Sequence, residues 1–234
     1  LYKGNSMSDI ALSYSRLSTF EQCQAKFDYL YVTKNVKDQG NEVSAYGNRV
    51  HEVLELYGKN ELVGELGIEA KQTLQRWGGL VDKINSRAGD KYYEYQMAIN
   101  KNREPVDWFS SDAYFRSIAD VLIVDGSTAY CLDYKTGKIK DNPTQLQLFA
   151  AMVFQHFPEV STVKTSFIWL MHDKLDNTTY ERRHLQSLWN GLQPRLDMVK
   201  EVVDLGVFKT KPSGLCPWCP AKEICPDARL RGRR

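Results

Sequence analysis

Three charged residues, Asp120, Asp133 and Lys135, have the types and the spacing of a site for hydrolytic chemistry. Asp133 and Lys135 lie two positions apart in an apolar run with the composition of a β-strand, so their side chains point to the same face. The turn sequence "DGS" separates this run from a second apolar run that carries Asp120, which is the pattern of a β-hairpin. With a two-residue turn, the register places Asp120 directly opposite Asp133.

Two opposed carboxylates repel each other and need a positive charge between them. The Cβ atoms of opposed residues lie about 4.5–5.5 Å apart, where like charges destabilise a sheet. Carboxylates and the backbone carbonyl of Tyr134 are hard oxygen ligands that suit Mg²⁺ or Mn²⁺, and the Lys135 ammonium could orient an attacking water. This is the equipment for metal-assisted phosphodiester hydrolysis. The alternative is a solvated ion pair on an exposed face, which the neighbouring apolar residues Ile118, Val121 and Leu132 disfavour.

The elements that must position these groups alternate between helical and strand patterns. Helices are predicted over residues 17–32, 48–59, 143–157 and 185–206, and 61–90 is weakly helical. Strands are predicted over residues 91–100, 114–124, 128–135 and 162–171. The strand–helix–strand order between 128 and 171 makes those two strands parallel. The sequence therefore predicts an α/β fold with a central mixed sheet and helices on both faces.

Composition excludes some classes of partner. A net charge of +2 over 234 residues does not indicate a polyanion partner, and 42% hydrophobic residues suffice for a packed core. No apolar run reaches the roughly 18 residues of a membrane span, so no membrane partner is expected. There is no signal-peptide pattern, so we expect a cytoplasmic protein of a bacterial, archaeal or phage-infected cell.

We predict a single domain over residues 7–226. Residues 1–6, "LYKGNS", precede a methionine and look like the end of a fluorescent-protein fusion partner, so we treat them as a fusion scar. Residues 227–234 contain four arginines and are predicted to be a mobile basic tail. This tail is either a DNA contact or a disordered solubility segment.

The order of these motifs resembles the PD-(D/E)xK nuclease superfamily, in particular the branch of the RecB C-terminal nuclease domain. Asp120 followed by "DYKTG" at 133–137 matches the acid and the D-x-K strand of that branch. "GNRVHE" at 47–52 is similar to its G-x-x-x-H-E helix, and "YSRLSTFEQC" at 14–23 is similar to its N-terminal helix. The resemblance covers residues 12–226.

The resemblance implies a restriction-endonuclease-like core and assigns roles to single residues. The implied ligands of one or two Mg²⁺ or Mn²⁺ ions are His51, Asp120, Asp133 and the carbonyl of Tyr134. Lys135 would position the nucleophilic water. Glu94 on the preceding strand and Gln145 on the following helix match further catalytic positions.

Each of these assignments has a plainer alternative. His51 could be a histidine satisfied within its helix, Glu94 a polar strand residue, and Gln145 a surface residue of a first helical turn. The chain also departs from the branch at two positions. Gln24 replaces the usual proline, and Phe149 replaces a tyrosine that would offer its hydroxyl to DNA.

Four of the five cysteines are candidate ligands of a metal centre. Cys216, Cys219 and Cys225 lie close together in "CPWCPAKEIC", and Cys23 lies far upstream. Four thiolates could bind Zn²⁺ or an iron–sulfur cluster, and spacing does not decide between them. The resemblance implies a 4Fe–4S cluster, as in AddB-type helicase–nucleases and CRISPR-associated adaptation nucleases, and thus an iron–sulfur element joining the two chain ends. Cys131 is expected to be a buried apolar residue.

We therefore expect a Mg²⁺- or Mn²⁺-dependent deoxyribonuclease, an exonuclease on single-stranded DNA or DNA ends, in recombination, repair or phage DNA processing. Lys138 and Lys140 would hold the DNA backbone. The alternative is a non-cleaving DNA-binding subunit of a repair, recombination or adaptation complex, against which the intact acids and lysine argue. A third possibility, an electron-transfer iron–sulfur protein, leaves the opposed acids unexplained.

Overall fold

A computed structural model describes residues 10–231 of the chain, with side chains described up to Ala228. The chain forms two compact units, each assembled from separate segments. One unit comprises Leu1–Gln39, Ala98–Arg116 and Trp189–Arg234, and the other comprises Gly40–Met97 and Ser117–Leu188. The assignment of residues 7–226 to a single domain stays a prediction, and the proposed fusion scar lies outside the described residues.

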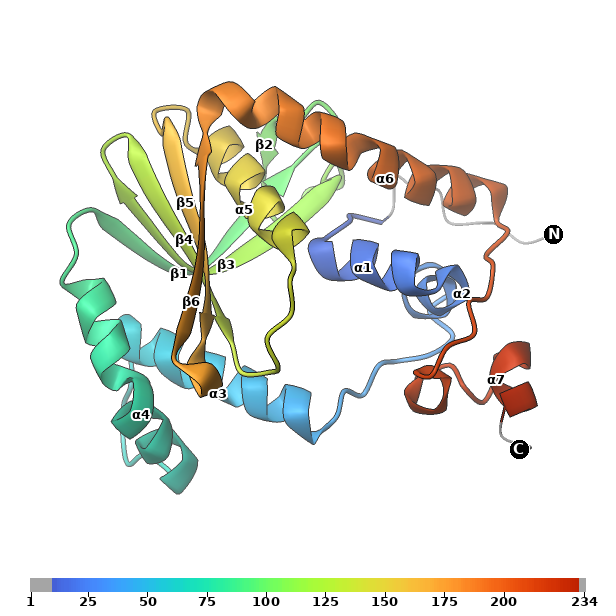
Figure 1. The fold of residues 1–234 in the computed structure, drawn as a ribbon, viewed down its shortest axis with the longest axis horizontal. Coiled ribbons are helices and arrows are strands. Elements are labelled where there is room, and N and C mark those ends of the chain that lie inside the picture. The colour runs from blue at the N-terminus through green and yellow to red at the C-terminus, as the bar shows by residue number, and fades with distance from the viewer. Residues whose placement is uncertain (1–9, 232–234) are drawn as a thin grey trace. The chain divides into compact units, whose positions relative to one another are not determined.

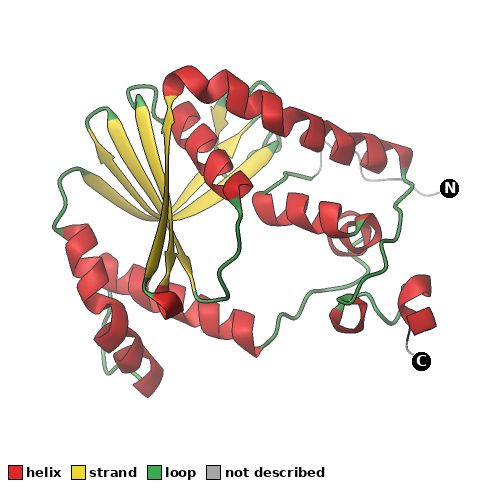
Figure 2. Ribbon diagram, in the orientation of Figure 1, coloured by secondary structure: helices red, strands yellow, loops and turns green. Residues whose placement is uncertain are grey.

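A six-stranded mixed sheet with the strand order β2-β1-β3-β4-β5-β6 confirms the predicted α/β fold (Figures 1 and 2). β3 (Phe115–Asp125) and β4 (Thr128–Lys135) are antiparallel, with Asp125 opposite Thr128 and Val121 opposite Leu132. This is the register that the hairpin pattern predicts. β5 (Thr162–Trp169) runs parallel to β4, and α5 (Pro143–His156) makes the crossover between them, as predicted.

Helices cover both faces of the sheet within the larger unit. α3 (Glu42–Gly58) and α4 (Ile68–Asn85) pack on one face, where Leu54 and Trp77 join a core that includes Val121 and Tyr134. Side chains alternate along a strand, so Asp133 points to the opposite face. α5 lies on that side, because its Gln145 hydrogen-bonds to Asp133.

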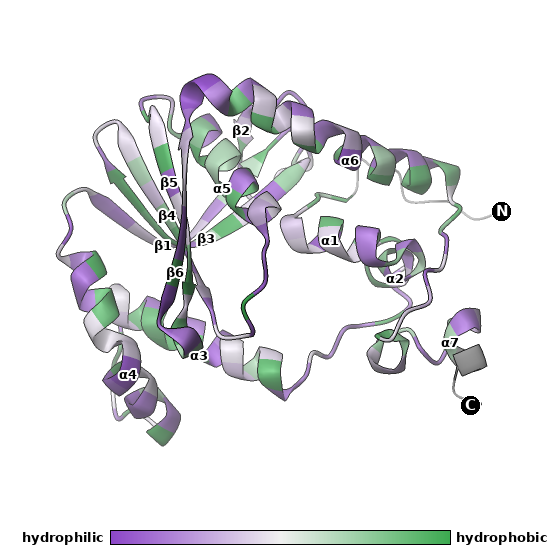
Figure 3. Cartoon of the chain, in the orientation of Figure 1, coloured by the Kyte–Doolittle hydropathy of each residue, from purple (hydrophilic) through white to green (hydrophobic). Residues whose placement is uncertain are grey.

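Two strands were not expected from the sequence. β6 (Lys174–Glu181) pairs antiparallel with β5 and is hydrophilic along most of its length (Figure 3). β2 (Pro105–Val106) pairs with the end of β1 (Asp90–Ile99). β6 lies at the end of the sheet, where polar side chains facing water hide its strand pattern.

The helix predicted over 17–32 is broken in the structure. α1 (Tyr14–Gln22) begins after the N-cap Ser13 and ends at Cys23, whose backbone is extended. α2 (Gln24–Phe27) and a π-helical turn over 28–32 follow. Ser18 stands three residues before Glu21, which is the spacing of a capping box, but it lies inside α1 and is not its N-cap.

The C-terminal segments belong mainly to the smaller unit. α6 (Leu185–Leu205) follows the prediction and contains Pro194. Residues 226–231 form α7 (Pro226–Arg231), where a tail was expected, and residues 232–234 lie outside the described part. No helix in the described part of the chain is long and apolar enough to cross a membrane.

Candidate active site

The hairpin β3–β4 presents two acids at the end of its ladder. The Asp120 carboxylate accepts the Tyr134 backbone N–H at 2.6 Å, so the side chain takes a bond that a strand carbonyl would otherwise make. The same oxygen, Oδ2, lies 3.4 Å from Nδ1 of His51. Asp120 is therefore tied both to β4 and to α3.

Three ligand-type side chains converge at Asp120. One ligand atom each from His51, Glu94 and Asp120 lies within 4.8 Å of the others, and the described residues contain no other such group. Glu94 reaches this place from β1 with a backbone φ of +49°, in the left-handed region that a residue with a Cβ rarely adopts. Such conformations cost free energy and are concentrated at functional sites. Glu94, expected only as an accessory residue, thus joins the group that could hold a cation.

Asp133 lies beside this group and has different partners. Its Oδ2 is 2.5 Å from the Lys135 ammonium, and its Oδ1 accepts a hydrogen bond from the Gln145 amide at 3.0 Å. The Lys135 ammonium also lies 5.0 Å from the centre of the Phe167 ring. The structure thus brings Asp133, Lys135 and Gln145 together. The ligand roles of Asp133 and of the Tyr134 carbonyl stay predictions.

The electrostatics of the site show a shortage of positive charge. Burial raises the pKa of Glu94 to about 7, with further contributions from the charges of Asp120 and Glu55. Burial and the Asp120 charge likewise raise the pKa of Asp133. Burial opposes the charging of His51, but the hydrogen bond to Asp120 and the charges of Asp120, Asp133 and Glu94 together outweigh it and raise the imidazole pKa. A bound divalent cation would stabilise these carboxylates in their ionised form.

α3, which carries His51, packs closely against the end of β4. The His51 imidazole meets the Tyr134 ring edge-on, with ring centroids 5.9 Å apart and an interplanar angle of 85°. One turn earlier, a Cβ atom on Gly47 would lie 2.9 Å from the hydroxyl of Thr136. Glycine therefore allows the helix to approach the end of β4 closely. Spacing alone did not reveal the contacts of Tyr134 and Thr136.

We expect Tyr134→Phe to leave the melting temperature unchanged or to raise it. The Tyr134 side chain is 2% exposed, and its hydroxyl has no hydrogen-bond partner among the described residues. An unsatisfied buried hydroxyl costs about 1–3 kcal/mol, and phenylalanine keeps the ring contact with His51. Tyr134→Leu, which removes that edge-on contact, is the comparison. A clear loss of melting temperature in Tyr134→Phe would show that the hydroxyl makes a stabilising interaction.

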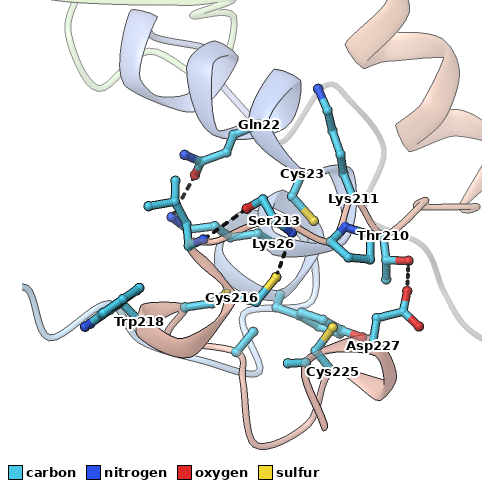
Figure 4. Close-up of a pocket in the computed structure, with 16 residues that line it drawn as sticks. Gln22, Cys23, Lys26, Thr210, Lys211, Ser213, Cys216, Trp218, Cys225 and Asp227 are labelled. Atoms are coloured by element: carbon cyan, nitrogen blue, oxygen red, sulfur yellow. Dashed lines mark hydrogen bonds between the residues drawn. The ribbon is translucent and has the colours of Figure 1, made fainter. Parts of the chain in front are cut away.

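The four predicted cluster cysteines line one cavity of about 180 Å³ in the smaller unit. Figure 4 shows Cys23, Cys216 and Cys225 around this pocket, with the Ser213 N–H donating to the Cys216 sulfur at 3.2 Å. No three cysteine sulfurs of the described chain lie within 4.8 Å of one another, as the ligand atoms of His51, Glu94 and Asp120 do. The iron–sulfur cluster therefore stays a prediction. Cys131 is fully buried in β4, as expected, and does not line the cavity.

The basic residues predicted to hold DNA are accessible. Lys138 and Lys140 are exposed in the loop that follows β4. Phe149, in contrast, is 3% exposed within α5, so it belongs to the core. The arginine side chains of the tail lie outside the described residues.

Comparison with known proteins gives one family and two similar structures. The model of the PD-(D/E)XK nuclease superfamily matches residues 11–226. No curated protein matches the chain. A crystal structure of a protein from Eubacterium rectale, provisionally described as an exonuclease, has 13% identity and a TM-score of 0.58, over 96% of this chain and 88% of its own. The crystal structure of SSO0001 has 12% identity and a TM-score of 0.43, over 92% and 85%.

Proposed function

Since the chain belongs to the PD-(D/E)XK nuclease superfamily, whose substrates are nucleic acids, we propose that it is a metal-dependent deoxyribonuclease. We propose further that it is an exonuclease on single-stranded DNA or DNA ends. The observation that carries the proposal is the convergence of His51, Glu94 and Asp120 beside the Asp133–Lys135 pair. The fold shared with the Eubacterium rectale protein is consistent with this function.

The donor set at Asp120 suits a divalent cation. Two carboxylates and one imidazole form a mixed oxygen and nitrogen site, which suits Mn²⁺ better than Mg²⁺ because Mg²⁺ prefers oxygen ligands. Such an ion, when bound, supplies a Lewis acid and lowers the pKa of its water ligand. His51, Glu94 and Asp120 would hold it, with Asp133 and the Tyr134 carbonyl as further ligands.

The remaining groups would orient the reactants. The Lys135 ammonium forms an ion pair with Asp133 and lies against the face of the Phe167 ring. These contacts would hold it where it can donate a hydrogen bond to an attacking water or to a phosphate oxygen. The Gln145 amide holds the other Asp133 oxygen and thereby orients the carboxylate. Lys138 and Lys140, exposed just beyond β4, would contact the DNA backbone without reading its sequence.

We also propose that the chain belongs to the RecB-like branch with a 4Fe–4S cluster bound by Cys23, Cys216, Cys219 and Cys225. The shared cavity supports this proposal, because segments far apart in the sequence bring four thiols to one place. Lys26 and Lys211 line the same cavity and would offset the negative charge of four thiolates.

Cleavage is expected to require Mn²⁺ or Mg²⁺, to stop with excess chelator, and to fail with Ca²⁺, whose coordination is looser. His51→Ala should weaken Mn²⁺ binding by roughly tenfold or more, since it removes one of three convergent donors. Isothermal titration with Mn²⁺ and cleavage of a labelled oligonucleotide measure the two effects. The exposed His172→Ala is the control.

Robust cleavage in excess chelator would contradict the metal mechanism. Metal-independent DNA binding with no cleavage under any of these conditions would favour the alternative of a non-cleaving subunit. Unchanged Mn²⁺ affinity in folded His51→Ala would remove the histidine from the ligand set.

A further inference from the structure

Two arginines of the smaller unit come together from distant parts of the sequence. An isolated bridge pairs Leu12 with Phe115, and the Arg116 N–H donates to the Leu12 carbonyl at 2.8 Å. The Arg16 guanidinium donates to the carbonyl of Ala11, the neighbouring residue. Arg16 and Arg116 are therefore anchored on the same short segment.

Aromatic rings hold each guanidinium in place. The Arg16 guanidinium lies 5.1 Å from the centre of the Tyr31 ring, and that of Arg116 lies 5.5 Å from the Trp108 ring. Arg116 also donates a long hydrogen bond of 3.5 Å to the Ser110 carbonyl. Both side chains are half-buried.

Among the described residues, the two guanidinium groups have carbonyl and aromatic partners in place of a carboxylate. Among the residues whose side chains the structure describes, Arg49, Arg183 and Arg195 each form an ion pair with a glutamate. Neither Arg16 nor Arg116 forms one within that part of the chain, and the buried Nε of Arg116 has no acceptor. Burial, and to a smaller extent the charge of Arg116, lower the pKa of Arg16, although Tyr31 partly opposes this.

Two like charges held together in a partly buried place destabilise the protein unless an anion lies between them. A phosphate group matches the need, because guanidinium groups bind its oxygens with paired, charge-assisted hydrogen bonds. The Nε of Arg116 is buried, so the terminal guanidinium nitrogens of the two arginines would make these bonds.

We propose that Arg16 and Arg116 together bind one phosphate group of the nucleic-acid substrate. The inference rests on the proposed nuclease function and adds a phosphate site to it. Arg16 lies in the N-terminal motif "YSRLSTFEQC", and the proposed metal site assigns no role to this arginine. Phosphate binding would be its function. The phosphate is either internal to the strand or the one at its end.

The test is the salt dependence of DNA binding by the full-length protein with Ca²⁺ in place of Mn²⁺. The probe is a labelled single-stranded oligonucleotide. Arg16→Gln and Arg116→Gln should each weaken binding roughly tenfold and lower the slope of log K against log salt by about 0.7, the value of one phosphate contact. The double variant should lower the slope no further, because both residues hold the same phosphate.

Controls separate a binding role from a structural one. Arg183→Gln removes an arginine whose side chain is 73% exposed and should leave the slope unchanged. Arg116→Lys keeps the charge and should restore the slope while recovering only part of the affinity, since lysine lacks the paired donors. Melting temperatures identify any variant that fails to fold. If a glutamine variant does not fold, the salt slope of Arg116→Lys decides between a binding role and a structural role.

Comparing 5′-phosphorylated with 5′-hydroxyl oligonucleotide distinguishes the two sources of the phosphate. A terminal phosphate predicts that the variants lose affinity only for the phosphorylated probe, and an internal phosphate predicts equal losses. Folded variants with wild-type affinity and slope would overturn this site alone. A wild-type protein that binds neither probe would overturn the proposed function as well.

Discussion

Replacing Asp133 by alanine is expected to lower the rate of DNA cleavage by about 1,000-fold or more. The carboxylate is 5% exposed and holds both the Lys135 ammonium and the Gln145 amide, so its loss releases the two groups that would orient the reactants. Asp120→Ala should have an effect of similar size, because it removes the acid at the centre of the His51–Glu94–Asp120 group.

The same substitution should not weaken the fold. Burial and the Asp120 charge raise the pKa of Asp133, so the ionised carboxylate is less stable in the folded protein than in the unfolded chain at neutral pH. Removing it should therefore leave the melting temperature unchanged or raise it. Asp125→Ala, at an exposed acid of the same hairpin, is the matched control and should cut normally. Wild-type cleavage by a folded Asp133→Ala protein would contradict the assignment.

Cys23→Ser is expected to cost the protein both its iron and a large part of its stability. A cluster that joins Cys23 to Cys216 closes a loop of most of the chain, which by the chain-entropy relation for cross-links corresponds to roughly 5 kcal/mol. Whole domains are stable by about 5–15 kcal/mol, so this loss should threaten the fold. Metal analysis and thermal melting of anaerobically purified protein measure the two losses, starting from about four irons per wild-type chain.

Cys131→Ala is the better control for this experiment. Cys131 is 0% exposed, so a serine in its place would bury a hydroxyl among apolar groups. The alanine variant should keep wild-type iron content. Zinc in place of iron would overturn the cluster, and an unchanged melting temperature in iron-free Cys23→Ser would overturn its structural role.

The β3–β4 hairpin was predictable because the residues that determine its turn and its register are close together in the sequence. "DGS" marks the turn, and the register that follows from it is the observed one from Asp125–Thr128 to Val121–Leu132, directly before Asp120 and Asp133. The helix α5 and the parallel pairing of β4 with β5 follow from similarly local patterns. A site built on such elements can be located before any coordinates are known.

Other features depend on contacts between distant residues. The break at Cys23 is accompanied by a hydrogen bond from the Ala25 N–H to the carbonyl of Lys209, which no periodicity near residue 23 reveals. β6 reads as a polar loop, and its strand form depends on pairing with β5, where Asp176 accepts the Trp169 indole N–H at 2.7 Å. Glu94 reaches the His51–Asp120 pair through a left-handed backbone that local propensity disfavours.

The most direct test of the central claim compares wild-type and Asp133→Ala protein on end-labelled linear DNA and on a closed single-stranded circle, with Mn²⁺. The account predicts that wild-type protein shortens the linear strand from an end, spares the circle and loses this activity in Asp133→Ala. Equal degradation of the linear strand by both proteins would show that the acids of the β3–β4 hairpin are not the nuclease site.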